Sequence, residues 1–544
     1  MHRINDVTLL RGHQFPEDAG PMAHPVRPES YIEINNFYTL TVYEKGAELI
    51  RMLHSILGET LFQRGMAIYL KRHDGGAATT DDFVCAMEEA LATGGHPDCP
   101  PDLAQFRLWY SQAGTPLLTI SSHYDQADQS LRLTVQQQAS PRAGKQAAML
   151  HIPVAIGLLG ADGQELTLRV GGDCGQSQTA KILHIQAAEQ TYTFTGIAQR
   201  PVPSLLRGFS APVRLHYEYS ADDLRFLLLH DSDPFNRWEA GQRLFINAIL
   251  GLVDELQAGR PLIFCQTIED IVCAVLAPTF HTDESFVAQV LTLPSEDYLA
   301  ELLSEIDIDA IHEAREFLRR ELGSRLHEQW LATYEANQTP APYCYDPVLA
   351  GRRRLKNLCL QYLLAVPTPE STSLGLQQFH EADNMSDEGA ALGALVHAGC
   401  SEAEVILTTF YAKWQGEALV LDKWFSLQAT TPLPGTLDRV KSLMGHSAFN
   451  IKNPNKVRAL IGAFASNPVC FHDRSGAGYE FLTDQVLALD AINPHIAARL
   501  AGRFAQWRRH LPCRQELIQG QLQRIMAQAG LSKGVFEVVS RTLS

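Results

Sequence analysis

The sequence predicts a multidomain, mainly α-helical protein in which a β-sandwich separates two helical regions. Two observations predict this fold class. The chain has 544 residues and is 45% hydrophobic, which suffices for two to four domains with buried cores. Apolar residues recur at helical spacing near both ends, whereas they alternate with polar residues, with a period of two, between Pro116 and Ser220. We therefore expect three domains, over residues 1–113, 114–219 and 220–544.

The first 113 residues are expected to begin as an irregular stretch and to continue as helices. Prolines crowd the start, at Pro16, Pro21, Pro25 and Pro28. From Glu44 onward, apolar spacing predicts helices over 44–57 and 59–72. The polar run that begins at Thr80 is predicted to cap the next helix.

Six short segments after Pro116 alternate apolar and polar side chains, and turn-forming residues separate them. They read LLTIS, LRLTVQQ, IPVAIGLL, ELTLRV, TYTFTGI and VRLHYEYS. This pattern is typical of a small antiparallel sandwich of about 100 residues. After Ser220, helical patterns dominate to Ser544 without a clean repeat period. Many consecutive short helices of this kind predict an α-superhelix of stacked helix pairs.

Charge and cysteine content exclude several classes of function. The formal charge of -16 disfavours nucleic acid as a partner, because such binding needs clustered positive charge. Ten cysteines are scattered without a CxxC pair, which indicates reduced thiols and a cytoplasmic location. The first residues of this sequence do not resemble a signal peptide, and it contains no run of about 18 apolar residues, so no membrane partner is expected.

The segment from Asn35 to Arg51, NNFYTLTVYEKGAELIR, carries the strongest chemical signal. Helical spacing begins at Glu44, so Tyr43 is expected at the start of a helix. A phenol has an ordinary pKa of about 10 and stays protonated at neutral pH, so it can donate a hydrogen bond to an oxyanion. The other interpretation is that Tyr38 and Tyr43 pack in a core, as many tyrosines do.

This segment resembles the one that carries the catalytic tyrosine in the M1 family of zinc-dependent aminopeptidases. Ordered similarity extends over essentially the whole chain, through RGHQFPEDAGPMAHPVRPESYIEINNFYTL, TVYEKGAELIRML, KRHDGGAATTDDFVCAMEEA, FRLWYSQAGTP, QFHEADNMSDEGAAL, LDKWFSLQA and NPNKVRALIGAFASNP. The resemblance implies that residues 1–113 are the helical end of a thermolysin-like catalytic domain. An Ig-like sandwich and the α-superhelix would follow it.

The family's zinc-binding motif is not in this sequence. Members bind zinc with HExxH on one helix and a glutamate on the next, and they bind substrate amines with a Gly-x-Met-Glu-Asn loop. The His-Glu pairs at His312, His327 and His380 all lack a second histidine four residues after the first. We therefore expect the zinc ligands to belong to a missing N-terminal part of the enzyme, and no zinc to be bound by this chain alone.

The resemblance also implies roles for five residues. Tyr43 would donate a hydrogen bond to the oxyanion of the transition state, and Tyr38 and Asn35 would line the nearby substrate subsites. Arg458 and Arg499 match positions from which the helical domain reaches the substrate cavity. A guanidinium can hold a carboxylate or backbone carbonyls of a peptide with a planar fork of donors. Without the resemblance, both arginines would be interpreted as surface residues.

Two further clusters are interpreted as structural. The His and carboxylate side chains of residues 380–383 place at most two ligands on one helix face, so a hydrogen-bonded helix junction is expected there rather than a metal site. In LVLDKWFSLQA, core spacing at Leu419, Trp424 and Leu427 predicts packing, and Asp422-Lys423 is expected to form a local ion pair.

Two functions remain open from the sequence. The first is the C-terminal portion of a zinc aminopeptidase that removes N-terminal residues from peptides, inactive until it meets the missing N-terminal part. The alternative is a non-catalytic peptide- or protein-binding module. A bare apolar surface at Leu9, Leu10 and Ile34 would favour the first, and a closed polar surface would favour the second.

Overall fold

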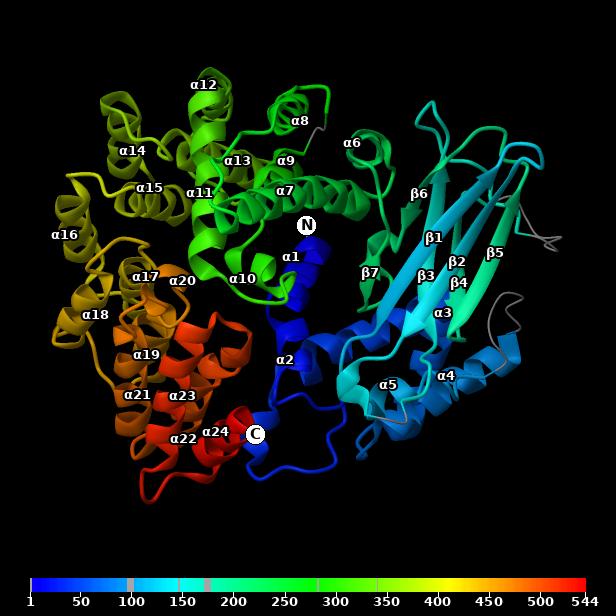
Figure 1. The fold of residues 1–544 in the computed structure, drawn as a ribbon, viewed down its shortest axis with the longest axis horizontal. Helices are drawn as coiled ribbons and strands as arrows, with labels where there is room; N and C mark the ends of the chain where they lie inside the picture. Colours follow the sequence, from blue (N-terminus) through cyan, green and yellow to red (C-terminus); the bar gives the residue numbers. More distant parts are fainter. Residues whose placement is uncertain (1, 95–101, 145–146, 171–177, 281–282, 340) are drawn as a thin grey trace. The chain divides into compact units, whose positions relative to one another are not determined.

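The computed structural model describes residues 2–94, 102–144, 147–170, 178–280, 283–339 and 341–544. They form two compact units, His2–Gly241 and Gln242–Ser544 (Figure 1). All strands that pair into sheets in the described chain belong to the first unit, and α7, Pro234–Gln257, contains the division between the units. The predicted fold class, mainly helical with one sandwich, is confirmed.

Residues 2–19 are helical, so the prediction of an irregular start was wrong there, whereas Pro21, Pro25 and Pro28 lie in an irregular stretch as predicted. Helix α1, His2–Leu9, continues into a π-helical turn, Leu10–Gln14, and then into α2, Phe15–Ala19. Pro16 lies in the first turn of α2, where a proline is tolerated because its missing N–H is not needed there. Pro16 is therefore compatible with the start of α2 and does not prevent this helix.

The helices predicted over 44–57 and 59–72 form a single kinked element, α3, Gly46–His73. Its Gly58 has a φ of 70°, which glycine adopts without steric cost, and this residue separates the two predicted segments. The next helix, α4, is Thr80–Gly94, and α5 is Leu108–Ser111. The cap of α4 is Thr79 rather than Thr80, because the Asp82 N–H donates to the Thr79 hydroxyl and the Thr79 N–H donates to the Asp82 carboxylate.

The sandwich consists of a four-stranded sheet of order β5-β2-β1-β7 and a three-stranded sheet of order β4-β3-β6. The strands are β1 Leu117–Asp125, β2 Ser130–Gln138, β3 Ile152–Leu159, β4 Ala180–Ile185, β5 Glu189–Thr195, β6 Val202–Leu205 and β7 Arg214–His216. Neighbours pair antiparallel except β1 and β7, which are parallel. The predicted strand ELTLRV forms only isolated bridges, and the sequence patterns missed β4 and β6.

Polar contacts attach the helices of the first unit to the sandwich. The Trp109 indole N–H donates to the carbonyl oxygen of His151 at 2.9 Å. Arg3 forms a bidentate ion pair with Glu48 of α3, with both N–O distances 2.5 Å, and also donates to the Phe209 carbonyl. Because Glu48 follows Tyr43 by little more than one helical turn, these contacts fix the start of α3 against the sandwich.

The second unit consists of short helices that stack in pairs along the chain (Figure 1). After α6, Ala221–His230, and α7, the helices are α8 Gln266–Leu276, α9 Glu284–Leu291, α10 Glu296–Glu301, α11 Ile308–Arg325, α12 His327–Ala336, α13 Pro347–Leu363, α14 Pro369–Glu381, α15 Met385–His397, α16 Ala403–Trp414, α17 Ala418–Ala429, α18 Thr436–Met444, α19 Pro454–Val457, α20 Pro468–Phe471, α21 Ala477–Asp490, α22 Pro494–Ala501, α23 Pro512–Met526 and α24 Lys533–Leu543. Consecutive helices pack together, for example α12 with α13 and α14 with α15. The predicted superhelix of stacked pairs is confirmed.

Packing around α17 overturns two sequence predictions. Asp422 pairs with Lys456, Nζ to Oδ1 2.7 Å, rather than with Lys423, because adjacent residues on a helix do not face each other. Leu419 is exposed, whereas Trp424 is buried. The junction between α14 and α15 is hydrogen-bonded, as expected. Asn384 caps α15, and the Asp383 carboxylate accepts a hydrogen bond from the backbone N–H of Tyr343.

A buried charge network joins the start of α11 to the last helices of the chain. Arg514, almost fully buried, donates to the Asp309 carboxylate and to the His472 carbonyl, each at 2.8 Å. The rings of His472 and His510 lie 4.6 Å apart beside it. Burial and the positive charge of Arg514 and Arg509 lower the pKa of His510 to about 4. Burial, His510 and Arg514 lower the pKa of His472 well below its ordinary value.

We expect the protein to lose stability as the pH falls below about 6.5, the ordinary pKa of histidine. His472 and His510 remain neutral in the fold but take up protons once unfolded, so protonation favours the unfolded state. His510 contributes a loss of about 1.4 kcal/mol per pH unit down to about pH 4.5, and His472 adds a loss of the same sign. His151, whose pKa burial and His184 lower to about 3, has the same sign. His312 has the opposite sign, because Glu296 raises its pKa despite burial.

Urea unfolding midpoints at neutral and mildly acidic pH measure this effect. We expect His510→Gln to flatten the pH dependence of the midpoint, because one of the titrating groups is removed. His13, which is exposed, serves as the matched control, and His13→Gln should leave the dependence unchanged. Equal pH dependence in the two variants would contradict the assignment to the buried pair.

Candidate functional site

Tyr43 lies on a single π-helical turn, Thr41–Lys45, that leads directly into α3. Turns of this kind are rare and are frequent at functional sites. Thr41 and Lys45 are buried, whereas Tyr43 between them is 57% exposed. The predicted position at a helix start is confirmed. Core packing, the other interpretation of Tyr43, does not apply in this structure.

Two consecutive carboxylates of α2 hold the residues on either side of Tyr43. Glu17 Oε1 accepts from the backbone N–H of Thr41 at 2.8 Å and from its hydroxyl at 2.7 Å. Asp18 pairs with Lys45, Oδ2 to Nζ 2.7 Å, and both side chains are at most 1% exposed. Lys45 also donates to the Gly114 carbonyl at 3.0 Å, and the Gly114 N–H donates to Asp18 at 2.8 Å. The turn that presents Tyr43 is thus clamped on both sides.

Sequence reasoning missed Glu17 and Asp18. Their partners lie 24 and 27 residues further along the chain, so no local pattern connects them. The available signal was the pair of adjacent acids in FPEDAG, within the first stretch of the chain that resembles the family. A buried lysine needs a carboxylate nearby, but only the fold shows which acid supplies it.

Large apolar side chains are exposed along the segment that leads to Tyr43. The Tyr38 and Tyr43 rings stack with centroids 6.5 Å apart. Tyr31, Ile32, Ile34 and Tyr38 are between 44% and 56% exposed. We call these four residues together with Tyr43 the aromatic surface. Of the three residues expected to be uncovered, Ile34 is exposed, Leu9 is half-buried and Leu10 is buried in the core, so the expectation for Leu10 was wrong.

The other residues implied by the resemblance lie on exposed positions. Asn35 is exposed, and its side-chain NH₂ and its backbone N–H both donate to the Glu33 carboxylate. The side-chain carbonyl oxygen of Asn35 is therefore the group open to a ligand. Arg458 and Arg499 belong to the second unit. Arg458 begins another π-helical turn, Arg458–Gly462, and donates to Asn455 at 3.2 Å. Arg499 is exposed on α22, and its guanidinium forms no ion pair with a residue that the structure describes.

The side chains that the structure describes do not fit the zinc site of the family that the sequence resembles. Within the described ranges, no three His, Cys, Asp or Glu side chains are grouped so that they could hold a metal ion. The sequence itself contains no HExxH. The exposed Tyr43 phenol can donate a hydrogen bond, and the other side chains of the aromatic surface can make apolar contacts.

Comparison with known proteins places the chain in a family. Residues 221–544 match a domain of unknown function described as ARM repeats, DUF3458_C, and residues 114–218 match DUF3458, described as an Ig-like fold. Residues 5–106 match the peptidase family M1 domain. The chain therefore belongs to the M1 peptidase family, and the Ig-like and ARM-repeat matches follow its M1 match along the chain.

Aminopeptidases are among its similar proteins. Aminopeptidase N of Escherichia coli (strain K12) is 43% identical over 548 residues, which span 100% of this chain and 61% of that protein. Aminopeptidase N of Haemophilus influenzae is 41% identical over 545 residues, spanning 100% of this chain and 61% of that protein. The crystal structure of Legionella pneumophila aminopeptidase A in complex with aspartic acid is similar with a TM-score of 0.84 at 30% identity, covering 95% of this chain and 58% of that one. The chain spans about three fifths of the length of these relatives.

Proposed function

We propose that this chain supplies the oxyanion-binding tyrosine and substrate contacts of an M1 aminopeptidase. In this proposal it takes part in removing N-terminal residues from peptides only when joined to polypeptide that carries the family's zinc ligands. The observation that carries the proposal is Tyr43, an exposed phenol on a turn fixed by Glu17 and Asp18. A donor held in place before the reaction stabilises a developing oxyanion without the cost of reorientation.

The chemistry assigned to this chain is the stabilisation of negative charge on the substrate. As the scissile carbonyl becomes tetrahedral, its oxygen gains charge, and the Tyr43 hydroxyl donates a hydrogen bond to it. Tyr38, stacked on Tyr43, and the Asn35 carbonyl oxygen would line the adjoining subsites. Attack on the carbonyl requires a nucleophile and a base that we assign to the N-terminal part of the enzyme rather than to residues of this chain.

The arginines of the second unit are proposed to hold the peptide. Arg458 and Arg499 each present a guanidinium at an exposed position, and a guanidinium forms two parallel hydrogen bonds with a carboxylate. The π-helical turn at Arg458 supports this role, because Tyr43 stands on a turn of the same rare kind.

The aromatic surface supports an N-terminal polypeptide partner. Its five residues, within the 13-residue segment 31–43, leave large apolar side chains uncovered, and exposed apolar patches mark interaction sites or ligand grooves. For this chain we propose three domains, over residues 1–113, 114–219 and 220–544, which the ranges of the family matches support. We also propose a cytoplasmic location, supported by the free thiols of the described cysteines. No helix in the described ranges has both the length and the apolarity to cross a bilayer.

The proposal is tested by joining this chain to the complementary N-terminal portion of the Escherichia coli relative as one polypeptide. We expect the fusion to hydrolyse an alanyl anilide in a chelator-sensitive reaction, and this chain alone to show neither hydrolysis nor stoichiometric zinc. Arg458→Gln and Arg499→Gln in the fusion should raise KM more than they lower kcat. The two arginines are proposed to bind the peptide equally in the ground state and in the transition state. Chelator-sensitive hydrolysis by this chain alone would overturn the proposal. Peptide binding by a folded fusion that lacks activity would favour the non-catalytic module.

A further inference from the structure

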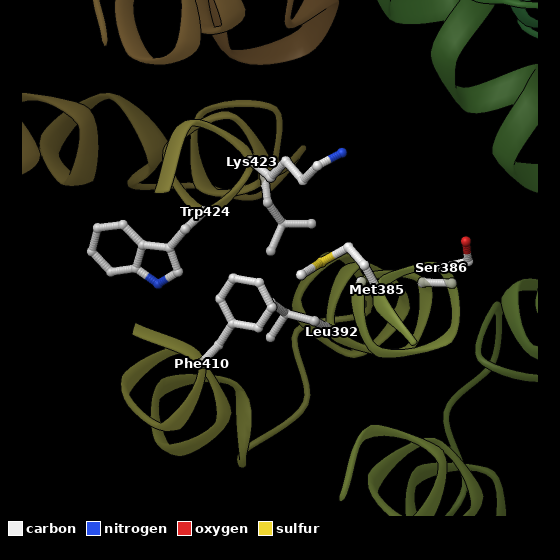
Figure 2. Close-up of a pocket in the computed structure, with 9 residues that line it drawn as sticks. Met385, Ser386, Leu392, Phe410, Lys423 and Trp424 are labelled. Carbon is white, nitrogen blue, oxygen red and sulfur yellow. The ribbon is translucent and has the colours of Figure 1, made fainter. Parts of the chain in front are cut away.

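A half-open cavity of about 260 Å³ lies between α15, α16 and α17 in the second unit (Figure 2). Its walls are mostly apolar, and Figure 2 shows Met385, Leu392 and Phe410 directed toward the space between the three helices. The lining residues are Met385, Ser386, Gly389, Ala390, Leu392, Phe410, Lys423, Trp424 and Leu427. The Trp424 indole N–H donates to the Leu407 carbonyl at 3.0 Å, so the polar atom of the ring is satisfied. The Trp424 ring packs against Tyr411, Phe425 and His446, so it forms a fixed apolar part of the cavity wall.

Gly389 leaves part of this cavity open. It lies inside α15, where glycine costs about 1 kcal/mol relative to alanine. A Cβ at this position would meet no atom within 4 Å, whereas a Cβ at Gly375 of α14 would lie 3.0 Å from a Leu395 methyl group. Packing within the protein therefore does not require glycine at position 389, and a side chain there would extend into the cavity.

Lys423 supplies a positive charge at the edge of the cavity. It is exposed and forms no ion pair with any residue in the described ranges, and its ammonium group lies away from the apolar side chains in Figure 2. The acidic groups nearby are already paired. Asp387 binds Lys356 at 2.8 Å, Glu388 binds Lys413 at 2.9 Å, and Asp422 binds Lys456. The site therefore offers a partner to an anion and none to a cation.

We propose that this cavity binds a small carboxylate with an aromatic or bulky apolar body. The body would fill the space beside Gly389 against Phe410 and Trp424, and the carboxylate would pair with Lys423. The volume is slightly below the range of about 300–1,000 Å³ that is usual for ligand pockets, so it suits a small ligand of about a dozen non-hydrogen atoms. A free amino acid fits less well, because its ammonium group would have no acidic partner. The same chemistry is found in free aryl-alkanoic acids and in the C-terminal residue of an apolar peptide.

The test uses 3-phenylpropionate as the probe and the Met385 methyl group as the reporter. In protein labelled with ¹³C at the methionine methyls, a bound aromatic ring should shift the Met385 signal, which Met385→Leu identifies. We expect a Kd on the order of 1 mM, as befits a small ligand in a half-open site. The neutral 3-phenylpropionamide should bind about 3-fold more weakly, because an exposed ion pair contributes little. Phenylalanine should also bind more weakly than the probe.

Two variants assign the binding to the two features of the cavity. Gly389→Leu should abolish the shift by filling the space, whereas Gly520→Leu, at an exposed helical glycine that also has no neighbour within 4 Å, should not. Lys423→Gln should remove the preference for the acid over the amide, and Lys441→Gln, at an exposed lysine of α18, should keep it. Unchanged signals of the other methionines show that each variant is folded.

Two ligands distinguish the sources of the carboxylate. Binding of acetyl-Ala-Ala-Phe at least as tight as that of 3-phenylpropionate would identify the C-terminal residue of peptides as the ligand. Preference for the small acid would identify a free aryl-alkanoic acid. Wild-type binding in Gly389→Leu, equal affinity for acid and amide, or no shift of Met385 up to about ten times the expected Kd would overturn the proposal.

Discussion

Tyr43→Phe is expected to lower the kcat of the fused enzyme by about 100- to 1,000-fold, the usual cost of removing one oxyanion donor. The hydroxyl is the only group lost, and the exposed ring keeps its stacking on Tyr38. Because the hydrogen bond to the oxyanion forms only as charge develops, KM should change little. Steady-state hydrolysis of an alanyl anilide by the fusion measures both constants.

Tyr38→Phe is the matched control for this experiment. Tyr38 is 56% exposed and belongs to the same stacked pair, so its variant removes a phenol hydroxyl from the same surface. We expect Tyr38→Phe to alter KM and to retain most of kcat. Equal losses of kcat in the two variants, or full activity of Tyr43→Phe, would contradict the assignment of Tyr43 as the oxyanion donor.

Lys45→Ala is expected to destabilise the first unit by about 3–5 kcal/mol, the cost of removing one partner of a buried ion pair. Asp18 would remain buried with an uncompensated charge, and its links to Gly114 would not neutralise it. Because Lys45 lies two residues after Tyr43 on the same π-helical turn, the remaining folded fusion should also show a lower kcat. Urea unfolding monitored by circular dichroism, together with the anilide assay, measures both effects.

The ion pair between Arg72 and Glu89 provides the comparison for Lys45. It lies in the same unit and its partners are about half exposed, so Arg72→Ala should leave the unfolding midpoint nearly unchanged. Replacing both Asp18 and Lys45 by residues without charge, as in Asp18→Asn with Lys45→Met, should cost less than Lys45→Ala alone, since no unpaired charge is left buried. Similar midpoints for Lys45→Ala and Arg72→Ala would show that the buried pair does not anchor the turn.

Much of the architecture could be predicted from local patterns. Alternation of apolar residues located the sandwich, and helical spacing located α3 on both sides of Gly58. The errors arose where a local signal is ambiguous. Pro16 begins a helix instead of preventing one, and Asp422 selects Lys456, 34 residues away, over its neighbour Lys423. The spacing of residues within one segment does not reveal which distant residue the folded chain places beside a given side chain.

The sequence by itself determined the family, the helical and sandwich regions, and the presence of a tyrosine at the start of a helix without HExxH. These features depend on residue order and periodicity, which the linear chain contains. Only the tertiary structure decided that Tyr43 is exposed and that Glu17 and Asp18 clamp its turn. It also placed Lys423 beside a cavity next to Gly389, with no ion-pair partner among the residues that the structure describes. Burial and charge pairing join residues distant in sequence, because folding places each ionised group beside whichever partner lowers the cost of removing it from water.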